Sequence, residues 1–260
     1  MHRRTKQRIG WLLSAGIGAA VLGGWLYWHQ RPLPAPSVQL QPSTTPATQP
    51  AAVLPPVVAT TPSTTSPPAA VLPASSDLNV PFTAQAPTAN WDAVHEEYCE
   101  EASALMVGRY FRNQTVADAA DAEAGMNDIA SWETDHGIPT TSATATQVAE
   151  LLHGMYGLSA TLVTDPSAED LKRLVANNHL VIVPAYGRAL KNPYFTAPGP
   201  VYHMLVLKGY TANDMFVTND PGIKQGANYQ YSTTILLNAI GDWNNGHPET
   251  GAHVVIDVSN

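Results

Sequence analysis

The distribution of proline most restricts what this chain can fold into. Twelve of its 22 prolines fall between Arg31 and Asp77, in a segment made almost entirely of Pro, Thr, Ser, Ala, Val and Gln. Such a segment buries too little apolar surface to offset the entropy cost of ordering it, and its prolines favour extended polyproline II geometry. We therefore expect residues 31–77 to be a disordered linker. The remaining residues, 78–260, are enough for one folded domain with a sizeable core.

The segment before the linker has the pattern of a membrane anchor. Its first eight residues contain four basic side chains: Arg3, Arg4, Lys6 and Arg8. An apolar run from Trp11 to Trp28 follows, near the lower length limit for a helix that spans the roughly 30 Å hydrocarbon core. Because the basic residues precede this run, the positive-inside rule predicts a cytoplasmic N-terminus and an extracytoplasmic location for the rest of the chain. Residues 1–30 are therefore predicted to be a single-pass signal anchor in the cell membrane. The alternative is a cleaved signal peptide, which would release a secreted protein.

Charge and cysteine content exclude several classes of function. Residues 78–260 contain 8 basic and 20 acidic residues, a formal charge of −12, whereas nucleic-acid binding depends on basic groups that neutralise phosphates. The single cysteine excludes an intramolecular disulfide and a zinc site built from several cysteines. The acidic run at residues 118–128 lacks the alternating ligands of a calcium loop and is predicted to be a solvated surface. We therefore expect no nucleic acid, no metal and no cofactor.

Hydrophobic periodicity predicts an α+β domain. Apolar residues recur at helical spacing in three early segments: 99–112, 146–156 and 167–177. Gly157 is suited to cap the second helix at its C-terminus, and Ser167 with Asp170 resembles a capping box for the third. Four later segments are short, are β-branched or alternating, and are bounded by turn residues: 180–183, 203–210, 215–219 and 253–258. Helices followed by strands predict helices packed on an antiparallel sheet.

Cys99 lies in the first turn of the first predicted helix. Unsatisfied backbone N–H groups and the positive end of the helix dipole stabilise a thiolate there. Glu100 and Glu101 oppose this effect, because adjacent carboxylates disfavour a further negative charge. A cysteine in a random position is more often a small buried apolar residue than a nucleophile. Outside the cytoplasm, however, a lone cysteine is either well buried or kept for its reactivity.

A thiol nucleophile needs a base, and the base needs a group that orients it. His203 begins a predicted strand in which it shares a face with Leu205 and Leu207. A turn at residues 211–214 returns the chain through a second strand that ends at Asp220. A four-residue or a two-residue loop makes Asp220 the neighbour of His203 on that face. A three-residue loop brings Asn219 there instead, because a one-residue slip inverts every side chain, so Asp220 is the preferred orienter and Asn219 the alternative.

These residues resemble the papain-like cysteine peptidases, and in particular the bacteriocin-processing branch, peptidase family thirty-nine. The matching motifs are Leu-Asn-Val-Pro-Phe-Thr-Ala-Gln at 78–85, Asn90-Trp91, Tyr-Cys-Glu-Glu-Ala-Ser at 98–103, His203 ahead of Val206 and Gly209-Tyr210, and Asn219-Asp220-Pro221-Gly222. The resemblance implies a papain-like fold for residues 78–260, with a nucleophile helix packed on an antiparallel sheet. Many relatives have Cys-Gly-Pro where this chain has Cys99-Glu100-Glu101.

The resemblance also implies the role of each site residue. Cys99 would be the nucleophile, His203 the general base and then acid, and Asp220 the group that fixes the imidazole tautomer. The side-chain amide of Gln85, with a backbone N–H near Cys99, would stabilise the oxyanion.

We therefore expect a membrane-tethered, extracytoplasmic cysteine peptidase that hydrolyses peptide or amide bonds. Its expected partners are a peptide or protein substrate, the cytoplasmic membrane and the cell envelope. Two alternatives remain open: a catalytically inactive module of the same fold that binds a peptide or an envelope polymer, and a peptidyl or acyl transferase or wall-peptide amidase.

Overall fold

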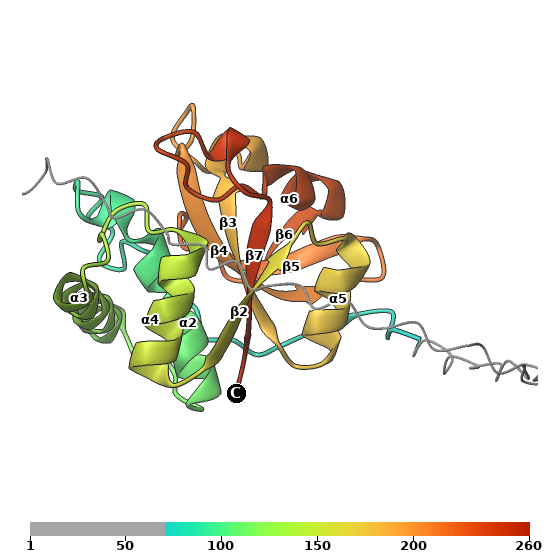
Figure 1. The fold of residues 1–260 in the computed structure, drawn as a ribbon, viewed down its shortest axis with the longest axis horizontal. Helices are drawn as coiled ribbons and strands as arrows, with labels where there is room; N and C mark the ends of the chain where they lie inside the picture. The colour runs from blue at the N-terminus through green and yellow to red at the C-terminus, as the bar shows by residue number, and fades with distance from the viewer. Residues whose placement is uncertain (1–70) are drawn as a thin grey trace, which may run out of the picture. The chain divides into compact units, whose positions relative to one another are not determined.

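A computed structural model describes residues 71–260 of the chain (Figure 1). Five α-helices and three short 3-10 helices lie in this part: η1 (His95–Glu97), α2 (Cys99–Phe111), α3 (Ala119–His136), α4 (Ala145–Tyr156), α5 (Ala168–Ala176), η2 (Gly187–Leu190), α6 (Thr233–Ala239) and η3 (Pro248–Thr250). The strands are β1 (Ser76–Asp77), β2 (Ser159–Thr164), β3 (Leu180–Tyr186), β4 (Tyr202–Tyr210), β5 (Met215–Asn219), β6 (Tyr229–Ser232) and β7 (Val254–Ser259).

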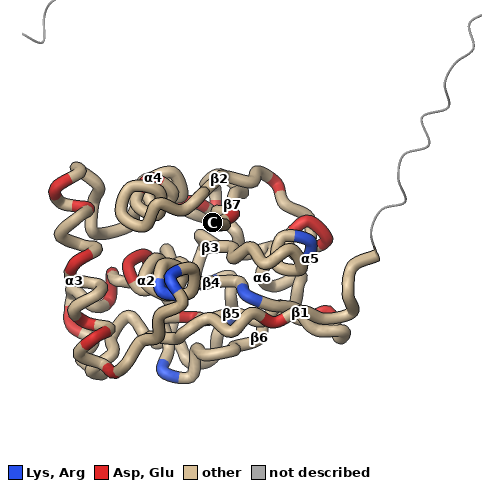
Figure 2. Tube along the Cα trace, turned by 90° about the horizontal axis from the view of Figure 1, so that it is seen from below, with Lys and Arg blue, Asp and Glu red and all other residues tan. Residues whose placement is uncertain are grey.

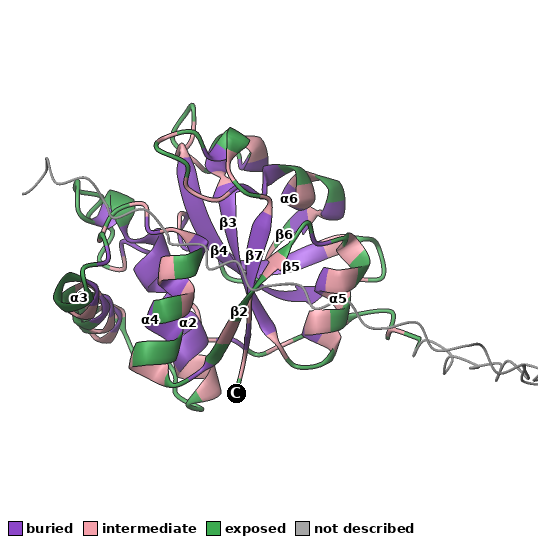
Figure 3. Ribbon diagram, viewed as in Figure 1, coloured by how far each residue is buried: buried purple, intermediate pink, exposed green. Residues whose placement is uncertain are grey.

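The strands form one seven-stranded antiparallel sheet with the order β2-β7-β3-β4-β5-β6, and β1 pairs with β4 off this path. Helices α2, α3 and α4 lie on one side of the sheet, and α5 and α6 lie on the other (Figure 1). Alternate residues of the central strands therefore enter two separate cores. Met204 and Val206 pack with α2 and α4, whereas Leu205 and Leu207 pack with α5 and α6. Burial on both faces makes every residue of β4 buried (Figure 3). The expected α+β architecture with an antiparallel sheet is confirmed.

Local capping chemistry defines the helix ends. Gly157 ends α4 in the left-handed conformation, with φ 72°, where a side chain would be strained. Ser167 and Asp170 form the expected capping box of α5, each side chain bonded to the backbone N–H of the other. Cys99 is the first residue of α2, as the sequence predicts.

Several elements were not predicted from the sequence. The largest is α3, which contains most of the acidic run and carries acidic residues along its length (Figure 2). Asp118 caps it by accepting a hydrogen bond from the Asp121 N–H. Its buried stripe consists of Ala122, Met126, Ile129 and Glu133, and the short alanine and the charged residue weaken the apolar period. Strands β2 and β6 and helix α6 are short and were also missed.

Two residues of the predicted linker belong to the sheet. Ser76 and Asp77, placed in the linker by composition, form β1 opposite Tyr210 and Gly209 of β4. Asp77 also forms an ion pair with the buried Lys208, which explains why two small polar residues are ordered here. The predicted signal anchor at 1–30 and most of the predicted linker at 31–77 lie outside the described residues. Within residues 71–260, no helix is long and apolar enough to cross a bilayer.

Candidate active site

Helix α2 positions Cys99 at one wall of a pocket. The helix is buried along most of its length, and Ala102, Leu105 and Met106 are at most 2% exposed. It packs against β4, the strand that carries His203. The cysteine is therefore held at the N-terminal end of a helix that cannot rotate without disrupting the core.

His203 and Asp220 are brought together by β4 and β5. His203 Nε2 lies 2.8 Å from Asp220 Oδ1, and the two side chains are 2% and 0% exposed. The preferred pairing of the sequence analysis is therefore present. Because Nε2 faces the carboxylate, Nδ1 is the ring nitrogen left for a reacting group.

The register that produces this pair differs from the expected one. Near the turn, Tyr210 lies opposite Phe216, so the loop contains five residues rather than four. An odd loop by itself would bring Asn219 to the face of His203. A β-bulge at Lys208 inserts one residue between Leu207 and Gly209. Beyond the bulge the pairing is again the expected one, in which Asp220 shares a face with His203.

Asn219, the alternative orienter, has a different position. Its Nδ2 donates hydrogen bonds to the carbonyl oxygens of Val80, at 3.2 Å, and Pro81, at 3.3 Å. Its Oδ1 accepts a hydrogen bond from the backbone N–H of Asn228. Asn219 thus ties the start of the domain to the β5–β6 loop and makes no hydrogen bond to His203.

The buried carboxylate of Asp220 accepts hydrogen bonds from four groups of the protein. Besides His203, it accepts hydrogen bonds from the Gly222 N–H at 2.9 Å, the Tyr231 hydroxyl at 2.5 Å and Asn192 Nδ2 at 3.2 Å. Burial raises the pKa of Asp220, but the charge of His203 and these hydrogen bonds outweigh it and hold the pKa below its ordinary value. Asp220 is therefore a buried, ionised acceptor that holds the imidazole of His203 through Nε2.

Two residues that hold this pair were missed by the sequence analysis, and a third, Gly222, appeared there only as part of a motif. Asn192 and Tyr231 bond to Asp220 and also to each other, at 2.7 Å. The alternation of Tyr229 to Ser232 between turn residues is a strand signal that could have indicated Tyr231. Asn192 follows the short helix η2 and has no local signal, because only the tertiary fold brings it to β5. Gly222 contacts the imidazole so closely that a Cβ there would lie 2.8 Å from His203 Cε1.

Gln85 lines the same pocket, but its amide is engaged. Its Nε2 donates to the carbonyl oxygens of His95, at 2.8 Å, and Glu96, at 2.9 Å. Its backbone N–H donates to the carbonyl of Pro221. Both amide hydrogens therefore have acceptors. An oxyanion could accept a hydrogen bond from Gln85 only by sharing one of these hydrogens with a main-chain carbonyl.

The thiol of Cys99 has an unexpected partner. Its Sγ donates a hydrogen bond to Glu100 Oε2 at 2.9 Å, and the hydrogen bonds of residues 71–260 include none between Cys99 and His203. Burial raises the pKa of the Cys99 thiol well above its ordinary value, and the charge of Glu100 raises it further. In this state Cys99 is a neutral thiol.

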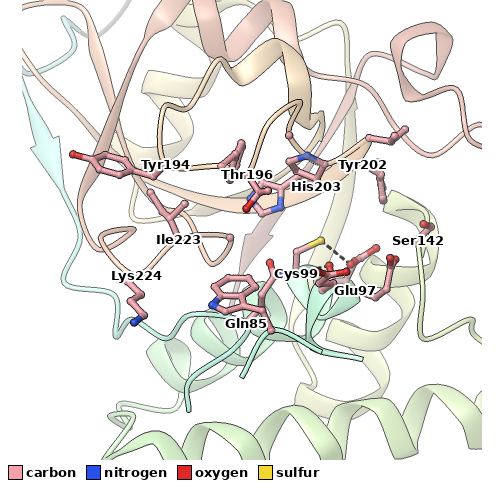
Figure 4. Close-up of a pocket in the computed structure, with 18 of the residues that line it drawn as sticks. Gln85, Glu97, Cys99, Ser142, Tyr194, Thr196, Tyr202, His203, Ile223 and Lys224 are labelled. Atoms are coloured by element: carbon pink, nitrogen blue, oxygen red, sulfur yellow. Dashed lines mark hydrogen bonds between the residues drawn. The ribbon is translucent and has the colours of Figure 1, made fainter. Parts of the chain in front are cut away.

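The pocket between these groups has a volume of about 640 Å³, within the usual range for ligand sites. Cys99 and Gln85 lie on one side, and His203 on the opposite side (Figure 4). Loop residues complete the walls, among them Tyr194, Thr196, Ile223 and Lys224. Phe195 meets the His203 ring edge to face, with centroids 5.4 Å apart. The pocket thus combines a thiol, an oriented imidazole and space for an extended ligand.

The chain is similar to one family of known proteins and to several solved structures. Residues 77–248 match the family described as the Peptidase_C39 like family. No curated protein matches the chain. Among solved structures, a C39-like peptidase from Bacillus anthracis is similar at 16% identity over 72% of this chain and 98% of that one, with a TM-score of 0.44. A fragment of Prevotella intermedia prointerpain A is similar at 12% identity over 72% of each chain, also with a TM-score of 0.44.

The family match covers well over half of the chain and includes every residue of the pocket described above. The chain therefore belongs to the Peptidase_C39 like family of cysteine-type peptidases, whose substrates are proteins or peptides.

Proposed function

We propose that this domain hydrolyses peptide or amide bonds, with Cys99 as nucleophile, His203 as general base and acid, and Asp220 as the orienting carboxylate. One observation carries the proposal: the buried His203–Asp220 pair opens onto the pocket that contains the only thiol of the chain. A nucleophile, a base and a group that orients the base are the minimum set for thiol acyl transfer.

The reaction would follow from these positions. His203 Nδ1 accepts the proton of the Cys99 thiol, and the sulfur attacks the substrate carbonyl carbon. When the C–N bond breaks, the imidazolium returns the proton to the leaving amine. Water, deprotonated by His203, then attacks the thioester carbonyl carbon, the C–S bond breaks to free the carboxyl product, and His203 returns the proton to the Cys99 sulfur. Asp220 remains ionised throughout and stabilises the imidazolium.

The oxyanion would be stabilised at the start of α2. The helix dipole favours negative charge there, and Gln85 lies on the same wall of the pocket. In this proposal the Gln85 amide shares one hydrogen between a main-chain carbonyl and the oxyanion. Gln85→Glu tests it, because the substitution keeps the shape and removes the amide donor. We expect the kcat to fall by about 100-fold, the usual cost of one lost oxyanion donor.

A peptide library analysed by mass spectrometry tests the activity. We expect cleavage by the wild-type chain and none by Cys99→Ala or His203→Ala. Alkylation by iodoacetamide at neutral pH should be slower in His203→Ala than in wild type. Equal and slow alkylation in both, with no cleaved peptide, would contradict the assignment.

One observation favours a second candidate, an inactive module that binds peptides in the same pocket. The thiol is bonded to Glu100 and not to His203. This candidate predicts that Cys99→Ala keeps full peptide affinity while no variant shows turnover.

A transferase is distinguished from a hydrolase by adding an amine nucleophile to the peptidase assay, because a transferase then gives an amide product of higher mass.

The proposal also places the domain outside the cytoplasm, tethered by residues 1–30. Its support is the basic cluster followed by the apolar run in the sequence. We expect the full chain to sediment with membranes and to be digested by protease added to intact spheroplasts. Deletion of residues 1–30 should leave the chain in the soluble cell fraction, and protection of the intact chain from the protease would contradict the assigned topology.

A further inference from the structure

Three carboxyl groups lie buried close to Cys99, and one of them, Glu100, also lines the pocket. Glu100, Glu101 and Glu133 are 3%, 1% and 0% exposed. The ion pairs within residues 71–260 include none between these carboxyls and a lysine or arginine. Buried carboxyls without a cation are normally uncharged, because desolvation disfavours the charged form.

Glu100 differs from the other two because it contacts the nucleophile. Its Oε2 accepts the Cys99 Sγ–H at 2.9 Å, as the dashed line in Figure 4 marks, and its Oε1 has no hydrogen-bond partner among the described residues. Glu101 and Glu133 lie close enough for the charge of one to raise the pKa of the other, and none of their carboxyl oxygens has a hydrogen-bond partner among the described residues. The thiol hydrogen is thus directed toward Glu100 and away from His203.

The groups that face Glu100 come from all neighbouring elements: Cys99 and Glu101 of its own helix, Glu97 of η1, Glu133 of α3, and His203 and Tyr202 of β4. Tyr202 donates in turn to Asp242, at 2.9 Å. His203 is the one basic group in this set. The charge of Glu100 is therefore opposed by several acidic neighbours and favoured by His203.

We propose that Glu100 is a positioning residue that controls the nucleophile: ionised Glu100 holds Cys99 as a neutral thiol, and neutral Glu100 releases the thiol proton to His203. The consequence for turnover rests on the function proposed above. The control of thiol reactivity does not, because it concerns only Cys99 and its neighbours.

The proton balance of the two states is simple. In the restrained state Glu100 is a carboxylate and accepts the S–H hydrogen bond. Uptake of one proton from solvent makes Glu100 a neutral acid. The thiol proton then passes to His203 Nδ1, and the Glu100 hydroxyl donates a hydrogen bond to the resulting thiolate. No bond between heavy atoms forms or breaks.

Glu100 changes its charge near neutral pH. Burial raises its pKa to about 7, although the hydrogen bond from Cys99 and the charge of His203 oppose the rise. Below this pH the restraint is absent, and above it the restraint is present. The nucleophile should therefore be more available in mildly acidic solution than the ordinary pKa of a thiol would allow.

Alkylation of Cys99 tests the proposal without any substrate, because the chain has no other cysteine. We would measure iodoacetamide rates from pH 5 to pH 8 for wild type, Glu100→Gln and Glu101→Gln. The alkylation rate of Glu100→Gln divided by that of wild type should be about one at pH 5 and about ten at pH 8. At pH 8 about nine-tenths of a group with a pKa of about 7 is ionised, so only about one-tenth of the wild-type molecules have an unrestrained thiol. Glu101→Gln is the matched control and should change this ratio far less than Glu100→Gln, since Glu101 has a smaller effect than Glu100 on the pKa of Cys99 and accepts no hydrogen bond from the thiol.

The proposal would be overturned if the relative alkylation rate of Glu100→Gln did not change with pH, or if that of Glu101→Gln rose with pH by the same factor. If circular dichroism shows that Glu100→Gln is unfolded, His203→Gln with Glu100 intact decides the question. Its rate should level off above about pH 7, whereas a continued tenfold rise per pH unit overturns the proposal. The expected labelling ratio without peptide cleavage supports the control by Glu100 and contradicts only the peptidase function.

Discussion

At the scale of single residues, the site depends on complete hydrogen bonding of one buried carboxylate. Asp220 has four donors, and three of them belong to groups other than His203. Removal of one partner from such a network leaves a buried polar group unsatisfied, which costs more than the hydrogen bond itself contributes. The network therefore specifies one position for the imidazole.

Asp220→Asn should lower the kcat/KM for peptide cleavage by about 100-fold. The amide oxygen can still accept from His203 Nε2, but the charge that stabilises the imidazolium is lost. Steady-state kinetics across pH measures this effect, and the loss should be largest near neutral pH. Asn219→Ala is the control, because Asn219 bonds only to main-chain atoms and should affect thermal stability more than kcat. A similar loss of kcat in both variants would contradict the assignment of Asp220.

Gly222→Ala should impair catalysis by displacing the imidazole. A Cβ at this position would lie 2.8 Å from His203 Cε1 and 2.9 Å from Phe195 Cε1, closer than real Cβ contacts. We expect a fall in kcat of at least about tenfold, since small displacements of reacting groups are costly. Slower alkylation of Cys99 with an unchanged far-ultraviolet circular dichroism spectrum would show that the effect is local.

At the scale of elements, helix α3 connects the acidic surface to the site. Its Glu123 carboxylate binds His95 Nε2 at 3.0 Å, and the His95 carbonyl in turn accepts from Gln85. Its Glu133 lies against Glu101 behind the nucleophile. The acidic run, which the sequence indicates only as a solvated surface, is therefore part of a helix that supports the wall of the pocket formed by Gln85 and Cys99.

Asp118→Ala should destabilise α3 from its N-terminus. The substitution removes the side chain that accepts the Asp121 N–H, and loss of such a cap costs about 1 kcal/mol. Denaturant unfolding monitored by circular dichroism measures the change. Asp128→Ala, an exposed substitution outside the first turn of the same helix, should change the stability by less than about 0.5 kcal/mol. Equal effects in both variants would contradict a capping role.

At the scale of the whole molecule, the buried carboxyls make stability depend on pH. Burial raises the pKa of Glu100 to about 7 and that of Glu133 to about 8, and it raises the pKa of Glu101 well above its ordinary value of 4.5. Groups whose pKa is higher in the folded state contribute stability that is fully present below the unfolded pKa. That contribution is lost as the pH rises through the folded values.

We therefore expect the free energy of unfolding to fall by at least about 2 kcal/mol between pH 5 and pH 8. Urea titrations of the domain at several pH values measure it. Glu133→Gln should flatten this dependence, whereas the exposed Glu150→Gln should leave it unchanged. A free energy of unfolding that is constant or rises between pH 5 and pH 8 would show that ionisation of the three carboxyls does not destabilise the fold.

The sequence by itself determined the features that depend on local chemistry. Cys99 at a helix start, the capped ends at Gly157 and Ser167, and the hairpin from His203 to Asp220 all follow from periodicity and turn residues close in the chain. The contact of Asp220 with His203 was predicted, but from a four-residue loop that the protein does not have.

Only the tertiary structure decided the rest. The bulge at Lys208 depends on pairing with β1 and β5 at once, and the acceptors of the Gln85 amide come from η1. The burial of Glu100 depends on packing among α2, α3 and β4, which makes a residue that is ordinarily favourable in a first helical turn into the partner of the thiol. Burial and register are sums over contacts distant in the chain, so no local pattern encodes them.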